Sequence, residues 1–305
     1  MPLIRMDYDT ATDGFRFSDP SMLDTPDAAR RVVIMVHGYK FDPARTDKTP
    51  HRHILDPRRD AAPARDMSWP RAMGFHGLTG EGLCIALGWP SLGGFAAAYR
   101  RAGDVGRALA PVITGIRARH PRTEITVMGH SLGARVGLSA LPHLRAGDVD
   151  RVIALSAADR IDTARAAMAT PAGRTARVLA VHSRENDLYD AAMECALPSG
   201  TSRALGSGWA DAPANWCDVQ IDCAETLEAL ARMDIDIAPP QRLICHWSSY
   251  TRPGVFDLYR AVAHGAVDPA ALRAFLPSDS APRWSRLIAP ARAITPLSFG
   301  AKPSS

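Results

Sequence analysis

The sequence predicts an α/β fold in which a mostly parallel, doubly wound sheet is covered by helices on both faces. Three observations support this prediction. Short apolar runs alternate with segments of helical periodicity, most of the runs are rich in Val, Ile and Leu, and their spacing suits right-handed crossovers. With 305 residues, 46% hydrophobic and 22% charged, the chain can bury one large core. We therefore expect a single domain over residues 1–305, with its core at about 31–265.

The expected elements follow in order along the chain. The predicted strands are residues 31–36, 83–87, 124–128, 151–155, 177–181 and 217–223. The predicted helices are residues 95–119, 131–144, 162–168 and 255–263.

Three stretches lack the periodicity of packed elements. Residues 199–216 are rich in Gly, Ser and Ala, and the prolines after residue 276 predict an extended C-terminal tail at 277–305. Residues 40–82 form an irregular connection of unusual length, and such connections are often functional. We consider two interpretations of 40–82, a lid or binding loop and a simple surface excursion.

The charge balance argues against a nucleic-acid partner, because 36 basic and 32 acidic residues leave a formal charge of only +4. The amino terminus lacks a signal-peptide pattern, and no apolar run approaches the ~20 residues of a membrane span. We expect a cytoplasmic protein without a membrane span. The sequence does not indicate an oligomeric state.

The pattern of Cys and His residues predicts neither a disulfide framework nor a metal site. The five cysteines are scattered, without zinc-site or redox-motif spacing. His51 and His53 have no obvious third ligand, so solvated or substrate-facing side chains are expected there. We expect no metal and no cofactor.

The most informative motif is the run Gly-His-Ser-Leu-Gly at 129–133. An apolar strand leads into it and a helical pattern follows, which predicts a nucleophile elbow with Ser131 at its tip. The two glycines are expected because side chains there would collide with the neighbouring strand or helix. The Leu132 backbone N–H and the helix dipole would then stabilise an oxyanion.

A second oxyanion donor is expected in the loop after the strand at 31–36. The Tyr39 backbone N–H is the candidate, since Gly38 would let the loop pass close to a substrate carbonyl. The alternative is a plain strand-ending turn.

A serine hydroxyl needs a base and an orienting acid, and after such an elbow the acid precedes the histidine along the chain. Four histidines follow Ser131, at 143, 182, 246 and 264. His246 is the predicted base because it follows the last strand by a loop and precedes a helix. Asp187, just past the strand at 177–181, is the predicted acid. Asp159, after the preceding strand, is the rival acid, and otherwise a helix cap or ion-pair partner.

Five segments together resemble the α/β-hydrolase superfamily, and within it bacterial esterase/lipase-like serine hydrolases. They are HGY at 37–39, GWPS at 88–91, GHSLGARV at 129–136, RENDLYD at 184–190 and CHWSSY at 245–250. The likeness covers about 31–265, and it departs from the family pattern at 40–82, where a short connection and a first helix are expected.

The resemblance implies a triad of Ser131, Asp187 and His246 with an oxyanion hole. It also implies hydrolysis of a small-molecule acyl ester, or of a thioester or amide, through an acyl-enzyme. Two alternatives stay open: acyl transfer to a non-water acceptor, and a catalytically silent binding protein of the same fold.

Overall fold

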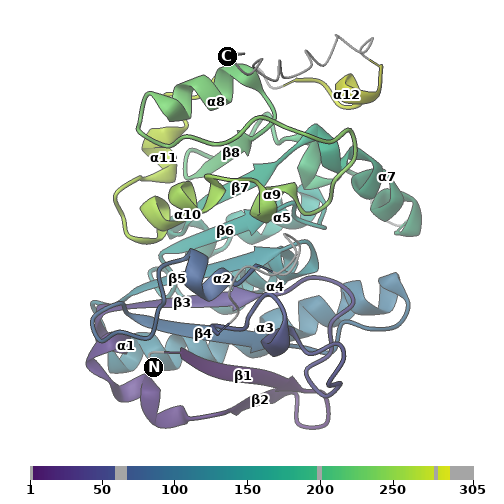
Figure 1. The fold of residues 1–305 in the computed structure, drawn as a ribbon. Coiled ribbons are helices and arrows are strands. Elements are labelled where there is room, and N and C mark those ends of the chain that lie inside the picture. Colours follow the sequence, from purple (N-terminus) through teal and green to yellow (C-terminus); the bar gives the residue numbers. More distant parts are fainter. Residues whose placement is uncertain (1–2, 59–66, 198–200, 278–280, 289–305) are drawn as a thin grey trace, which may run out of the picture.

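The computed structural model describes residues 3–58, 67–197, 201–277 and 281–288. In these ranges an eight-stranded sheet has the order β2-β1-β4-β3-β5-β6-β7-β8 (Figure 1). Only the β1–β2 pair is antiparallel, and all other neighbouring strands are parallel. The strands are β1 (Leu3–Asp9), β2 (Gly14–Phe17), β3 (Arg31–Val36), β4 (Leu83–Gly88), β5 (Glu124–His130), β6 (Arg151–Leu155), β7 (Arg177–His182) and β8 (Trp216–Gln220). The predicted α/β class and mostly parallel sheet are confirmed.

Helices cover both faces of the sheet (Figure 1). They are α1 (Pro26–Arg30), α2 (Trp69–Ala72), α3 (Phe95–Arg119), α4 (Leu132–Ala140), α5 (Ile161–Met168), α6 (Pro171–Thr175), α7 (Asp187–Ala196), α8 (Ala224–Ala231), α9 (Ser248–Thr251), α10 (Val255–Ala263), α11 (Pro269–Leu272) and α12 (Ser285–Ile288). Single-turn 3-10 helices lie at η1 (Pro20–Asp24), η2 (Pro50–Arg52), η4 (Leu141–His143), η5 (Arg184–Asn186) and η6 (Leu205–Ser207).

Two hydrophobic cores, one on each face, result from the alternation of side chains along each strand. On β3, Val32, Ile34 and Val36 belong to the core that also contains buried residues of α1, α3, α4, α5 and α6. Val33 and Met35 belong to the core on the other face, which contains buried residues of α2, α8, α10 and α11. A strand buried on both faces needs a continuous apolar run, which is why the central strands were predictable.

Strand β1, which lies between the edge strand β2 and β4, was not predicted, for the same physical reason. It alternates buried Ile4, Met6 and Tyr8 with the more exposed Arg5 and Asp7, so it lacks a continuous apolar run. The core therefore begins well before residue 31.

The segment 40–82 packs against the rest of the protein and is not a simple surface loop. Ile54, Leu55, Trp69, Met73 and Phe75 are all buried in the second core. The expectation of a stretch without packed elements is thus wrong for its described part. Residues 59–66 lie outside the described residues.

The other two irregular stretches also contain ordered elements. The stretch 199–216 includes η6 and the buried Trp209, whose ring contacts Trp216 edge-on. In the predicted extended tail, residues 285–288 instead form α12, and 289–305 lie outside the described residues. None of the helices in the described ranges is long and apolar enough to cross a membrane.

Candidate active site

Ser131 lies at a strained turn between β5 and α4. Its backbone has φ +56° and ψ −120°, a conformation that L-residues rarely adopt. A Cβ on Gly129 would lie 2.3 Å from the Gly133 carbonyl carbon, and one on Gly133 would lie 2.2 Å from Val36 O. Both glycines are therefore required by the close approach of strand and helix. The turn has the strand–turn–helix geometry expected of a nucleophile elbow.

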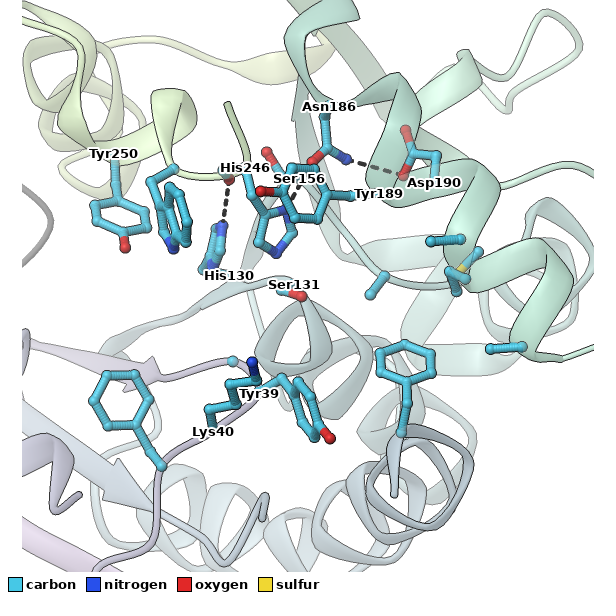
Figure 2. Close-up of a pocket in the computed structure, with 18 of the residues that line it drawn as sticks. Tyr39, Lys40, His130, Ser131, Ser156, Asn186, Tyr189, Asp190, His246 and Tyr250 are labelled. Carbon is cyan, nitrogen blue, oxygen red and sulfur yellow. Dashed lines mark hydrogen bonds between the residues drawn. The ribbon is translucent and has the colours of Figure 1, made fainter. Parts of the chain in front are cut away.

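Ser131 opens into a cavity of about 440 Å³ at the carboxyl ends of β3, β5, β6 and β7. His246 lines the same cavity (Figure 2). The segment 40–82 contributes Lys40, Phe41 and Ile54 to the lining, so it forms part of the wall.

The imidazole of His246 is fixed by a side chain that sequence reasoning did not single out. His246 Nδ1 lies 2.6 Å from Asn186 Oδ1, and Asn186 Nδ2 donates to Asp190 Oδ1 at 2.9 Å. Because the amide oxygen faces the ring, Nδ1 donates, and the neutral ring keeps its lone pair on Nε2. Figure 2 shows the ring between Asn186 and Ser131. Burial, followed by the nearby His130, holds the pKa of His246 well below its usual value.

Two aromatic neighbours hold the His246 loop in place. His130 Nε2 donates to the His246 carbonyl at 2.9 Å, and burial lowers the pKa of His130 to about 4, so this ring is neutral. The Tyr189 ring stacks on His246, with centroids 4.6 Å apart and planes 22° apart. His130 thus fixes the backbone of His246, and Tyr189 covers one face of its ring.

Asp187, the predicted acid, takes other partners. Its Oδ2 accepts from the Trp284 backbone N–H at 2.7 Å, and its Oδ1 lies 3.3 Å from Arg184 Nη1. The adjacent Asn186 takes the place against His246 instead. This differs from the prediction because Asp187 begins α7, which turns its side chain toward the C-terminal segment.

Asp159, the rival acid, is a structural residue in this arrangement. The fully buried carboxylate accepts from Arg135 Nη1 at 2.9 and 3.0 Å, from Tyr99 Oη at 2.6 Å and from the Arg160 N–H at 2.8 Å. Asp159 pairs with Arg135 of α4, whereas the guanidinium of the adjacent Arg160 donates to the carbonyls of Ser202, Glu194 and Leu197.

The loop after β3 lies against the elbow. A Cβ on Gly38 would lie 2.9 Å from His130 O and 3.0 Å from Ser131 Cβ, so only glycine fits. Tyr39 follows it and lines the cavity.

The motif after β4 anchors that loop. The Trp89 N–H donates to His37 Nε2 at 3.0 Å, and Ser91 Oγ donates to Gly38 O at 2.9 Å. Burial lowers the pKa of His37 to about 3, which keeps its ring neutral and able to accept. The loop that bears the predicted Tyr39 donor is thereby fixed relative to Ser131.

Sequence reasoning did not single out Asn186, Asp190 and Ser156 as site residues, although all three line the cavity. Ser156 has φ +42° and donates to Ser249 Oγ at 2.9 Å. Ser156 and Asn186 follow the carboxyl ends of β6 and β7, and that position was the available signal, whereas Asp190 lies within α7.

Among the described residues, no group of three or more His, Cys, Asp or Glu side chains could hold a metal ion. His51 Nε2 instead contacts Asp7 Oδ1 at 2.6 Å.

Comparison with known proteins gives a family match. Residues 21–172, just under half of the chain, match the family model described as "Alpha/beta hydrolase of unknown function (DUF900)". No curated protein is significantly similar to the sequence.

Solved structures of low sequence identity are also similar to part of the chain. The catalytic core domain of acetyl xylan esterase from Trichoderma reesei is 16% identical, over 44% of this chain and 66% of that one, with a TM-score of 0.28. Trichoderma reesei cutinase in complex with a phosphonate inhibitor is 16% identical, over 42% and 52%, with a TM-score of 0.24. Propionate-bound esterase Est2 from Thermogutta terrifontis is 13% identical, over 56% and 70%, with a TM-score of 0.27. The chain spans just under two thirds and about half of the first two structures.

Proposed function

We propose that this chain is a serine hydrolase of the α/β-hydrolase family that cleaves carboxylic esters with apolar acyl groups. One observation supports this above all: the strained Ser131 and His246, whose Nε2 keeps its lone pair, line one cavity. A serine hydroxyl is a poor nucleophile unless such a base removes its proton.

The reaction would proceed through an acyl-enzyme. His246 Nε2 takes the Ser131 Oγ proton while Oγ attacks the ester carbonyl, and the backbone N–H groups of Leu132 and Tyr39 stabilise the oxyanion. The tetrahedral intermediate expels the alkoxide, which leaves as the alcohol with the proton from His246. Water, deprotonated by His246, then attacks the acyl carbon and releases the acid and free Ser131.

The lining of the cavity supports an apolar acyl group. Phe95 and the α7 side chains of Ala192, Met193 and Ala196 form an apolar wall. Apolar surface of this kind favours hydrocarbon over charged groups. A cavity of about 440 Å³ also lies in the size range of ligand pockets.

Covalent labelling tests the nucleophile. A fluorophosphonate probe should label the wild-type protein, and Ser131→Ala should abolish labelling. Ser139→Ala, on the same helix, is the matched control and should be labelled like wild type. Equal labelling of Ser131→Ala, or no labelling of folded wild type, would contradict the proposal.

A series of p-nitrophenyl esters tests the substrate class. We expect kcat/KM to increase from acetate to butyrate and hexanoate, because each added CH₂ that is buried contributes about 0.8 kcal/mol. Met193→Asp should remove that increase. A preference for acyl groups with a terminal carboxylate would contradict the apolar assignment.

A further inference from the structure

We propose that Asn186 and Asp190 together orient His246, with Asn186 in contact with the imidazole and Asp190 as the carboxylate behind it. Both are positioning residues, and the inference rests on the proposed function of Ser131 and His246. It replaces the single acid that the sequence predicted.

Two hydrogen bonds link Asp190 to Asn186 and Asn186 to His246, and they fix which atoms donate and which accept. Asn186 is 1% exposed, and its Oδ1 lies 2.6 Å from His246 Nδ1 while its Nδ2 lies 2.9 Å from Asp190 Oδ1. Rotating the amide by 180° would place Oδ1 against a carboxylate oxygen and the NH₂ group against a ring N–H. Asp190 thus selects the amide orientation, and the amide selects the ring tautomer with the free Nε2.

The position of Asp190 makes it a dedicated partner of Asn186. It lies four residues further along, one helical turn into α7, so the two side chains share a face. Asp190 is 2% exposed, and a Cβ on Gly206 would lie 2.1 Å from its Oδ2. Within the described part of the chain, Oδ2 has no hydrogen-bond partner. The carboxyl group is therefore enclosed, and among the described residues only Asn186 donates a hydrogen bond to it.

The charges around Asp190 come from several elements. Arg184 of η5 and Arg283 of the C-terminal segment attract it, Asp187 of α7 repels it, and η6 contributes no titratable side chain. Arg283 also pairs with Glu194 at 3.0 Å, which fixes it beside α7. Burial, the largest effect, raises the pKa of Asp190 to about 7.

The rate of catalysis should depend on whether Asp190 is ionised. A charged Asp190 polarises the Asn186 amide and thereby favours the imidazolium that forms in the transition state. The pKa of His246 is well below 6.5, so the base itself is free at lower pH. We therefore expect kcat to rise near pH 7, where Asp190 loses its proton.

The test combines steady-state kinetics with ¹⁵N NMR of the histidine rings. In wild type, neutral His246 should carry its proton on Nδ1, and Asn186→Ala should lose this fixed tautomer. Its kcat should fall about tenfold or more, with little change in KM. Asp190→Asn can keep the hydrogen bond but not the charge. Its kcat should fall severalfold at pH 8, and its rise near pH 7 should disappear.

Two matched variants complete the design. Asp211→Asn removes an exposed carboxylate and should behave as wild type. Asp187→Asn tests the acid that the sequence predicted. A loss of kcat and of the Nδ1 tautomer in Asp187→Asn but not in Asn186→Ala would overturn the inference, as would an unchanged pH profile in Asp190→Asn.

The NMR readout separates the two proposals. If folded wild type neither hydrolyses esters nor binds the fluorophosphonate, the proposed function fails. The tautomer of His246 and its dependence on Asn186 are still measurable in that protein. An unchanged tautomer in Asn186→Ala would then overturn the orienting pair by itself.

Discussion

Asp190→Asn should change how the free energy of unfolding depends on pH. The pKa of Asp190 is about 7 in the folded protein, against 3.8 for the ordinary group. Between these values the folded state holds a proton that the unfolded state has released, so this group lowers the free energy of unfolding as pH rises. About three pH units, at about 1.4 kcal/mol per unit, amount to about 4 kcal/mol.

The substitution removes this titration but keeps a side chain of the same shape. Relative to wild type, Asp190→Asn should therefore gain about 4 kcal/mol of stability between pH 4 and pH 8. Urea unfolding of both proteins at the two pH values measures this gain. Comparing the two proteins cancels the contributions of the titrating groups that they share. The same pH dependence in both would refute the burial argument, and Asp211→Asn should show no such gain.

Three further substitutions test the structure around the site. Gly133→Ala places a methyl group 2.2 Å from Val36 O, so urea unfolding should show a free energy of unfolding that is lower by about 1–3 kcal/mol. Fluorophosphonate labelling should also be lost, and full labelling would contradict the steric argument. Trp69→Ala should cost about 3–5 kcal/mol, because the side chain is fully buried; a cost below 1 kcal/mol would mean that the 40–82 segment does not stabilise the core. Arg135→Met should cost about 3–5 kcal/mol because it leaves Asp159 as a buried charge, and adding Asp159→Asn should recover part of that loss in a double-mutant cycle.

Much of the sheet and the elbow could be predicted because their signals are local. Strands β3 and β6 and helices α3 and α10 have the bounds that the periodicity predicted. Strand β1 was missed, since its side chains alternate between core and solvent. Helix α7 was missed because its sequence places two acidic residues, Asp187 and Asp190, on buried positions that hydrophobic periodicity does not count.

The sequence by itself determined the fold class, the strand–turn–helix around Ser131 and the need for glycine on either side, because backbone sterics and hydrophobic periodicity act between near neighbours. Only the tertiary structure decided which side chain after β7 meets His246. Asn186 and Asp187 are adjacent, and their directions differ because η5 passes into α7 between them. Contacts from residues distant in sequence then fixed the choice, since the Trp284 N–H and Arg184 hold Asp187 while Asp190 holds Asn186 toward the imidazole.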